Sequence, residues 1–449
     1  MNAGTGPSVP GTPPTERADR RALPAGEAKA RMKRWAGLLG TYFTAQSVTQ
    51  LAGILAGILI VRHLPVSEFA LYTLASSLTA LLAIASDLGS NSSLLHFYRG
   101  AEARGERFSD YVGAVLDLRR AAFAVGSVVL LAAAPFLGAA RGFGRTESFG
   151  SALFVLATVW SQIGSSIRLV LLRLAACYGA AYRAELSGGL FRLAAIALLI
   201  YFAHLSSLAA LAVGALAAAL VLFLADSPHA HPGRGEPGAR DIARRSVGRY
   251  LLPTLPSALY FAIQSPLTIW LAAKFGTTQS IAEIGALGRL GLIIGLLTGL
   301  SGAVLVPRLA GIIDPRAFRT NFFRYGGLLA ALAGSIWLAA ALMPDLFLAL
   351  LGPHYRGLKH ELLLLIAGSG LSMLGSYVAN VNLTRGWTRL QAAALACEIS
   401  TQVVLIATLP LATTAGVIWF QVGGASAGVA FQLAIFALGL QRPEWVAWK

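Results

Sequence analysis

The sequence predicts an all-α protein that crosses a membrane about twelve times. Apolar residues make up 56% of its 449 residues, and charged residues make up only 12%, whereas soluble domains carry about 25% charged residues. The mean hydropathy is +0.66. Uncharged segments of about twenty residues, the length of a helix that spans a bilayer, recur along the chain. These observations place the chain among polytopic membrane proteins.

Twelve apolar segments are predicted to form the membrane-spanning helices, each by its length and its lack of charge. The first two form a hairpin, because a helix that ends at Arg62 and His63 is followed by a turn with Pro65 and Ser67 and then by a second apolar helix. The twelve segments cover residues 36–61, 68–90, 121–139, 149–166, 186–203, 206–225, 250–273, 284–306, 325–344, 361–382, 391–410 and 413–439.

The polar stretches between these segments divide the chain. Residues 1–34 are rich in proline, glycine and charge, which predicts a disordered tail. Their basic end leads straight into a full-length span, which differs from a cleaved signal peptide. The longest later interruption, residues 226–249, is predicted to be a cytoplasmic linker between an amino-terminal six-helix lobe at 35–225 and a carboxyl-terminal lobe at 250–441, with a second tail at 442–449.

The two halves resemble each other weakly. Lys274 in the second half stands where Arg62 stands in the first, and Glu283 stands where Glu68 stands. In both halves a turn with the acid is followed by a long apolar helix. Paired halves of this kind are a recurrent design of transporters.

The distribution of Lys and Arg predicts the orientation. With the amino terminus inside, 29 of the 36 basic residues fall on the cytoplasmic side and six on the other, with Arg289 inside a span. This bias is typical of cytoplasmic loops, so both termini are predicted to be cytoplasmic. It also accounts for the net charge of +16 without nucleic-acid binding. The outward loops are all short, so we expect any function to reside in the helices.

Residues 58–97, ILIVRHLPVSEFALYTLASSLTALLAIASDLGSNSSLLHF, resemble the first hairpin of bacterial polysaccharide exporters. In that family a helix ending in Leu-Ala-Arg-x-Leu-Gly is followed by Phe-Gly-x-Tyr and later by Asp-Leu-Gly. Residues 283–307 are similar to the eighth span of the family, and residues 383–391 to the link before the eleventh. The matching residues of the hairpin are Arg62, Leu64, Glu68, Phe69, Tyr72, Asp87, Leu88 and Gly89.

The resemblance implies a flippase of the multidrug, oligosaccharidyl-lipid and polysaccharide exporter superfamily. Such a protein has two six-helix lobes around a central cavity that opens alternately to the two faces of a bacterial cell membrane. It moves a polyprenyl-pyrophosphate-linked oligosaccharide outward for surface polysaccharide biosynthesis, including exopolysaccharide and lipopolysaccharide. Its expected partners are membrane lipids and the polymerase or glycosyltransferases of the same pathway. The chain departs from the family at Ala70, which replaces glycine, and at Ser265 and Pro266, where many members carry an Asp-Arg pair.

Basic residues inside the spans are the first candidates for substrate binding, because a lipid-linked pyrophosphate is anionic and a charge in the membrane is costly unless it faces protein or water. Arg289 lies in the eighth span, Arg192 in the fifth, and Arg62 at the end of the first. Each has a structural alternative. Arg289 could pair with an acid or carbonyl, Arg192 could snorkel or pair with Glu185, and Arg62 could anchor a helix at the outer interface.

Four further polar residues are candidates. Asn380 and Asn382, near the end of the tenth span, could contact sugar hydroxyls or cap that helix. Glu398 in the eleventh span could couple a proton or cation, or could bond to neighbouring hydroxyl and amide side chains. Asp87 matches the Asp-Leu-Gly motif near the cytoplasmic interface, which favours a role in a gate or in the hairpin over ion coupling.

The sequence carries no phosphate-binding glycine loop and no metal-ligand spacing, so neither an enzyme nor a cofactor is predicted. Cys177 and Cys397 lie in separate apolar segments and are expected to be packing residues. Two alternatives to the flippase stay open. A multidrug exporter of the same superfamily would carry acids in its amino-terminal lobe, and a membrane polysaccharide polymerase or ligase would ordinarily need a large external loop.

Overall fold

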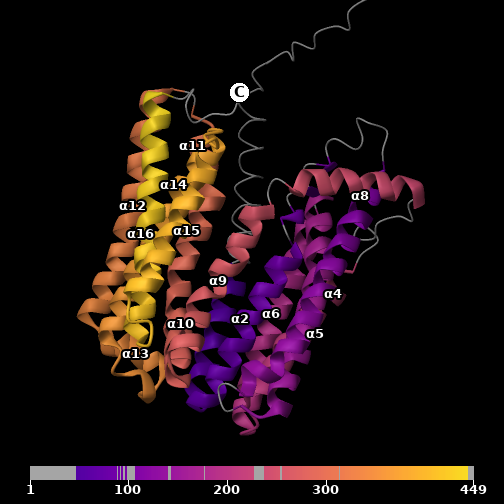
Figure 1. The fold of residues 1–449 in the computed structure, drawn as a ribbon, viewed down its shortest axis with the longest axis vertical. Coiled ribbons are helices and arrows are strands. Elements are labelled where there is room, and N and C mark those ends of the chain that lie inside the picture. The colour runs from indigo at the N-terminus through magenta and orange to yellow at the C-terminus, as the bar shows by residue number, and fades with distance from the viewer. Residues whose placement is uncertain are drawn as a thin grey trace, which may run out of the picture. The chain divides into compact units, whose positions relative to one another are not determined.

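The computed structural model describes residues 47–442, with gaps at 88, 92, 95–96, 99–106, 140–142, 176, 227–236, 253–254 and 313. The predicted tail at 1–34 and residues 443–449 of the second predicted tail lie outside the described residues, as does the start of the first predicted span. All regular elements in the described part of the chain are helices (Figure 1).

The first half contains a helix for each of its six predicted spans. A helix at Ser47–His63 is joined by a tight turn to α2 (Val66–Asp87), as the hairpin pattern predicted. The others are α4 (Phe108–Ala139), α5 (Arg145–Leu174), α6 (Tyr178–Tyr201) and α7 (Ser207–Leu224). α4 begins at Phe108 and not at residue 121, because the helix continues beyond its apolar segment. Arg119, which the sequence placed in a loop, is therefore part of a helix.

The second half likewise contains a helix for each predicted span. α10 continues through a π-helical turn, Ser301–Leu305, into α11 (Val306–Ala310), and together they cover the predicted eighth span. Two short helical pieces between α12 and α14, α13 (Pro344–Leu351) and Pro353–Tyr355, were not predicted. The spans are α9 (Leu255–Phe275), α10 (Thr278–Leu300), α12 (Pro315–Leu342), α14 (Lys359–Thr384), α15 (Gln391–Thr408) and α16 (Thr414–Gln441).

The predicted linker at 226–249 is not an irregular segment throughout, because α8 (Pro237–Leu251) occupies its second part. Its buried residues Ala243, Val247 and Leu251 recur at intervals of four and form one apolar stripe that packs on α4. Arg240 adds an ion pair of 2.9 Å with Asp117 of α4. Proline and glycine at its start obscured this amphipathic pattern in the sequence.

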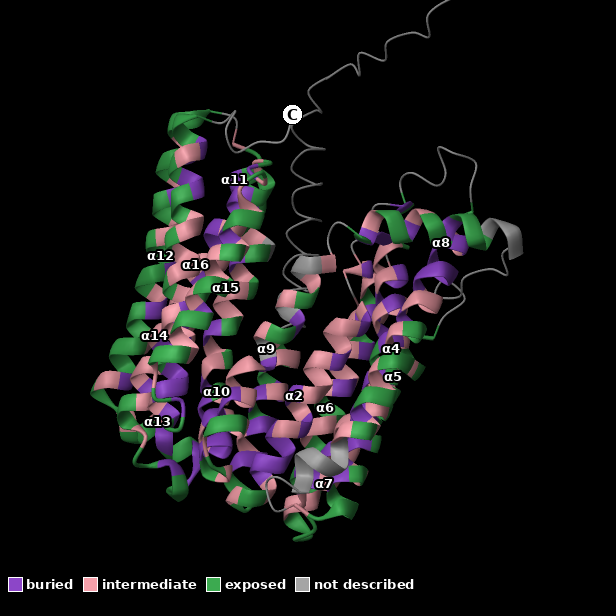
Figure 2. Cartoon of the chain, in the orientation of Figure 1, coloured by how far each residue is buried: buried purple, intermediate pink, exposed green. Residues whose placement is uncertain are grey.

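The helices pack through α2 in the first half and α14 in the second. α2 contacts α4, α5 and α7, and it also packs against α9 and α10 of the second half. α14 contacts α10, α12 and α16. Figure 2 shows buried residues along the facing sides of these helices and exposed residues on their outer sides. α2 thus packs against helices of both halves.

The exposed sides of the helices are apolar, as expected of surfaces that face lipid. In α4 the side chains of Val125, Val128 and Val129 are 68%, 69% and 63% exposed. Among the described residues, nine helices are long and apolar enough to cross a membrane. The chain is a multi-pass membrane protein.

The weak sequence echo between the halves has a structural counterpart. Glu68 at the start of α2 accepts a hydrogen bond of 2.7 Å from the backbone N–H of Ser207, the first residue of α7. Glu283 near the start of α10 accepts one from the hydroxyl of Thr414, the first residue of α16. In each half, therefore, an acid of the second span holds the start of the sixth.

Candidate functional site

Arg192 and Arg289, the two arginines predicted inside spans, meet at one buried tyrosine of α2. Arg192 of α6 donates a hydrogen bond of 2.6 Å from its Nη2 to the hydroxyl of Tyr72. The guanidinium carbon of Arg289, on α10, lies 5.7 Å from the centroid of the Tyr72 ring, within the range of a cation–π contact. Tyr72 is only 2% exposed. These three residues form the Tyr72 cluster, which brings together α2, α6 and α10.

Glycines make room for this cluster. A side chain at Gly57, in the helix Ser47–His63, would place its Cβ 3.0 Å from Cδ of Arg289, so glycine lets the arginine lie along that helix. A Cβ at Gly285, one turn before Arg289, would lie 2.5 Å from the hydroxyl oxygen of Thr73. The close approach of α10 to α2 at this position therefore requires glycine.

Neither arginine of the Tyr72 cluster has a carboxylate partner among the described residues. The nearby acids are engaged elsewhere. Glu185 pairs with Arg173 at 2.8 Å and not with Arg192 as the sequence alternative held. Glu283 accepts from Thr414 and from Gln279. The Nε atoms of Arg192 and Arg289 are buried without a hydrogen-bond partner. The cluster therefore holds two uncompensated cations.

One residue of the loop between α13 and α14 is buried near Glu283. Tyr355 lies in the helical turn Pro353–Tyr355 and is only 3% exposed. Burial, and after it the carboxylate of Glu283, raises the pKa of Tyr355 to about 12. Tyr355 therefore stays neutral at physiological pH.

A second polar feature lies within the carboxyl-terminal half. Here α9, α14, α15 and α16 enclose a cavity of 530 Å³. Asn380 and Glu398, predicted to bind sugar and to couple an ion, both line it, together with Gln264, Gln402, Gln421 and Gln432. We call it the amide cavity. Gln402 donates to Gln264 at 2.8 Å and to Tyr260 at 3.1 Å, which ties α15 to α9.

Asn382 does not line the amide cavity, although its partner Gln432 does, and Arg62 belongs to neither feature. Asn382 is fully buried, and its side-chain amide donates to both the carbonyl and the side chain of Gln432, at 2.9 and 3.0 Å, so it links α14 to α16. Arg62 is exposed at the end of its helix, beside Gly352 of the loop that follows α13 in the second half. Gly352 has a φ of +107°, a conformation that favours glycine.

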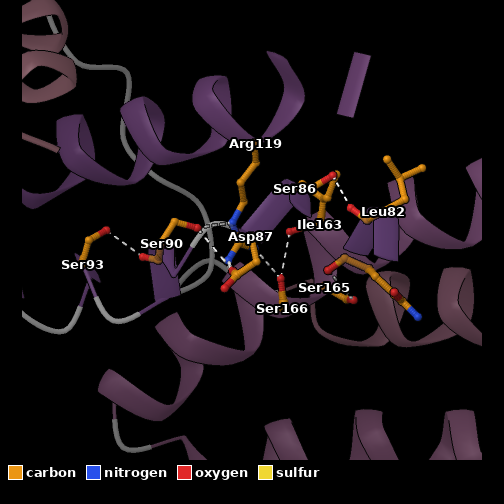
Figure 3. Close-up of polar contacts among 10 residues, drawn as sticks. Leu82, Ser86, Asp87, Ser90, Ser93, Arg119, Ile163, Ser165 and Ser166 are labelled. Atoms are coloured by element: carbon orange, nitrogen blue, oxygen red, sulfur yellow. Dashed lines mark hydrogen bonds and ion pairs between the residues drawn. The ribbon is translucent and has the colours of Figure 1, made fainter. Parts of the chain in front are cut away.

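Asp87 is engaged in a buried polar group at the predicted cytoplasmic end of α2 (Figure 3). It forms an ion pair with Arg119 of α4, whose side chain is 2% exposed. Arg119 also donates to the hydroxyls of Ser90 at 2.6 Å and of Ser166, on α5, at 2.7 Å. The pair fastens the end of α2 to α4 and α5.

Sequence reasoning missed three parts of these features. Tyr72 was noted only as a motif residue, although an aromatic residue between two spans with arginines is a natural cation partner. Arg119 was placed in a loop. The glutamines were overlooked because they are uncharged, yet Gln421 and Gln432 share a helix face with Ala425 and Gly428 at intervals of three and four. That spacing of polar residues on apolar helices was the available signal.

Comparison with known proteins gives matches only in structure. No protein-family model and no curated protein matches the sequence. The lipid II flippase MurJ in an inward closed conformation aligns with a TM-score of 0.69 at 12% identity, over 89% of this chain and 87% of that one. An inward-facing multidrug resistance MATE family transporter of the MOP superfamily aligns as well, with a TM-score of 0.58 at 15% identity, over 89% of this chain and 95% of that one. The chain therefore has the fold of these transporters.

A MATE transporter from Vibrio cholerae is similar too, with a TM-score of 0.58 at 16% identity over 91% of this chain and 98% of that one. These likenesses confirm the predicted fold class, an all-α polytopic membrane protein with about twelve transmembrane helices. At identities of 12 to 16% they concern the fold alone. The lobe boundaries and the roles of the site residues stay predictions.

Proposed function

We propose that the chain is a flippase that moves a polyprenyl-pyrophosphate-linked oligosaccharide from the cytoplasmic to the outer leaflet of a bacterial cell membrane by alternating access. The observation that carries this proposal is the Tyr72 cluster, with two arginines from different halves and no carboxylate beside them. Two half-buried cations inside a membrane protein are unfavourable without an anion beside them. A pyrophosphate would supply the missing negative charge.

Arginine suits this ligand because its planar guanidinium makes two parallel hydrogen bonds to phosphate oxygens. Arg192 is held in place by the Tyr72 hydroxyl, and Arg289 by the face of the ring. The tyrosine therefore orients both cations without neutralising them. Because α6 and α10 belong to different halves, an anion held between them would respond to any movement of one half against the other.

The remaining site residues have roles within this proposal. Glu398 would couple transport to a proton or cation, and the membrane potential could also contribute, since one charge crossing 100 mV releases about 2.3 kcal/mol. Asp87 would hold the cytoplasmic gate through Arg119. Arg62 would act at the outer face beside Gly352. Asn380 would contact sugar from the amide cavity, with Asn382 supporting its helix. The pathway's polymerase or glycosyltransferases would take up or supply the glycan.

The test uses purified protein and undecaprenyl pyrophosphate. Each charge-assisted hydrogen bond contributes about 1.5–3 kcal/mol, so Arg289→Ala and Arg192→Ala should each weaken binding about 10- to 100-fold. Arg183→Ala is the matched control, because Arg183 is exposed on the same helix α6 and bonds only to the carbonyl of Gly179 among the described residues. Equal binding by Arg289→Ala, Arg192→Ala and the control would refute the proposal.

A second candidate function is export of drugs coupled to a cation. The likeness to MATE transporters is compatible with it, and Glu398 in the amide cavity favours it by offering a carboxylate for the coupling ion. Deletion of the gene separates the two functions. Accumulation of undecaprenyl-linked glycan on the inner leaflet supports the flippase, and unchanged glycan with new drug sensitivity supports the exporter.

A further inference from the structure

The amide cavity is built from one face of each of four helices. Thr268 follows Gln264 by four residues on α9, and Gln402 follows Glu398 by four on α15. Residues four apart lie on the same side of a helix, so each helix turns a polar stripe toward the cavity and an apolar surface away from it. A volume of 530 Å³ lies within the range of small-molecule binding pockets. The cavity can therefore hold a ligand of several rings or chains.

The lining of the cavity is polar but nearly uncharged. It has five carboxamide side chains and one carboxyl group, Glu398, and no basic residue among the described ones. A phosphate would meet no cation there and would face a carboxylate. Carboxamides both donate and accept hydrogen bonds, which matches a neutral ligand with many hydroxyl groups. The carboxamides belong to Gln264, Asn380, Gln402, Gln421 and Gln432.

Several of these polar groups are not used within the protein. Elsewhere on α15 and α16, Ser400, Thr401 and Ser426 donate to the carbonyl four residues earlier, which is how hydroxyls are usually satisfied in apolar helices. The hydroxyls of the cavity make no such bond in the described structure. They belong to Thr268, Ser372 and Ser376.

Two of the carboxamides likewise make no hydrogen bond within the described part of the protein. Asn380 and Gln421, from α14 and α16, have no hydrogen-bond partner among the described residues, although both line the cavity. The other carboxamides are fixed in place. Gln402 bonds to Gln264 and Tyr260, and Gln432 exchanges hydrogen bonds with Gln391 at 2.9 and 3.3 Å. The cavity thus combines a rigid frame with free donors and acceptors, as a preorganised binding site does.

We propose that the amide cavity binds sugar rings of the transported lipid-linked oligosaccharide, separately from the pyrophosphate. This inference rests on the proposed function, because it assigns the uncharged part of the same substrate to a second site. Asn380 and Gln421 bind the sugar hydroxyls, and Glu398 accepts further hydrogen bonds from them. Phe420 supplies an apolar wall for the C–H face of a ring. The Tyr72 cluster binds the charge, and the cavity recognises the glycan.

The experiment compares two ligands on the purified full chain. One is undecaprenyl pyrophosphate, and the other is the undecaprenyl-linked oligosaccharide extracted from cells that lack the gene. Wild type should bind the glycan-bearing lipid at least about tenfold more tightly, the effect of one or two additional neutral hydrogen bonds. The double variant Asn380→Leu with Gln421→Leu should lose most of this difference and bind undecaprenyl pyrophosphate as wild type does.

Leucine keeps the size of both side chains and suits a membrane helix, and Ser426→Ala on α16 is the control that should leave both affinities unchanged. Equal affinity of wild type for the two lipids would overturn the inference. A double variant with equally reduced affinity for both lipids would also overturn it. A double variant that changes only the affinity for Na⁺ or protons would overturn it as well, because the cavity would then be a cation site. The proposed function fails separately, if Arg289→Ala binds undecaprenyl pyrophosphate as wild type does.

Discussion

Arg192 donates a hydrogen bond of 2.6 Å to the hydroxyl of Tyr72, although the two residues are 120 positions apart in the sequence. Tyr72 is the only described hydrogen-bond partner of that guanidinium, and its ring faces Arg289 on the other half. One neutral side chain therefore positions two charges. This arrangement concentrates positive charge inside the protein without a carboxylate partner among the described residues.

Tyr72→Phe should destabilise the protein in a way that an anion reverses. The ring remains for Arg289, but Arg192 loses its acceptor, which costs about 1–3 kcal/mol for a buried donor. The midpoint of thermal unfolding should fall, and undecaprenyl pyrophosphate should raise it more in the variant than in wild type. Tyr377→Phe is the control, because its hydroxyl bonds to the carbonyl of Phe322 at 2.9 Å away from the cluster. The same ligand response in both variants would contradict the prediction.

Arg192 and Arg289 should act as a pair on one ligand. If both hold the same pyrophosphate, the loss of either leaves the other poorly placed, and the double alanine variant should bind little worse than each single one. Independent sites would instead give additive losses. A double-mutant cycle of undecaprenyl pyrophosphate affinities measures this coupling directly, and full additivity would show that the two arginines serve different ligands.

The glycines of α10 offer a sharp test of its packing on α2. Gly285→Ala would bring a methyl group to 2.5 Å from the Thr73 hydroxyl, whereas a Cβ at Gly288 meets no atom within 4 Å. Overpacking costs about 1–3 kcal/mol, so Gly285→Ala should lower the unfolding temperature. Gly288→Ala should leave it unchanged or raise it, since alanine favours helix over glycine by about 1 kcal/mol. The same response of both variants would exclude a close contact at Gly285.

Asp87→Asn should destabilise the protein more than Arg119→Met does. Removing the acid leaves Arg119 buried and charged, which costs about 3 kcal/mol, at the low end for buried pairs because Asp87 is 32% exposed. Methionine removes the charge together with its need for a partner. Asp117→Asn breaks the more exposed pair with Arg240 and should cost less than about 1 kcal/mol. Thermal unfolding of the three variants gives the order, and a reversed order would contradict the structural role of the pair.

The sequence was sufficient for the helices and for part of the site. Long uncharged segments indicate spans directly, and a charge within them, such as Arg289 or Arg192, stands out because of its cost in a membrane. The same reasoning could not show that both arginines meet at Tyr72, since that depends on how helices far apart in the chain pack. It misplaced Arg119 because hydropathy detects the apolar part of a helix and not its continuation beyond the membrane.

The glutamines of the amide cavity were also not predicted from the sequence. Gln421 and Gln402 change the hydropathy of a span little, so their stripes were not noticed. Asn380 and Asn382 are two residues apart and were both predicted to contact sugar or to cap the helix, yet only Asn380 lines the cavity, whereas Asn382 is buried and bonded to Gln432. Residues two apart do not share a helix face. That rule could have separated them before the structure did.

The three residues of the Tyr72 cluster leave the ribosome in the order Tyr72, Arg192, Arg289, and this order bears on how the protein is assembled. α2 and α6 are synthesised before the second half, so Arg192 can reach Tyr72 early. α10 then has to enter the bilayer with an arginine, at roughly 2.5–3.5 kcal/mol for a central position, and Arg289 reaches the ring only when α10 packs on α2. A nascent chain that stops before α10 holds one cation of the pair. The Tyr72 cluster is thus completed only after synthesis of the first half and the start of the second.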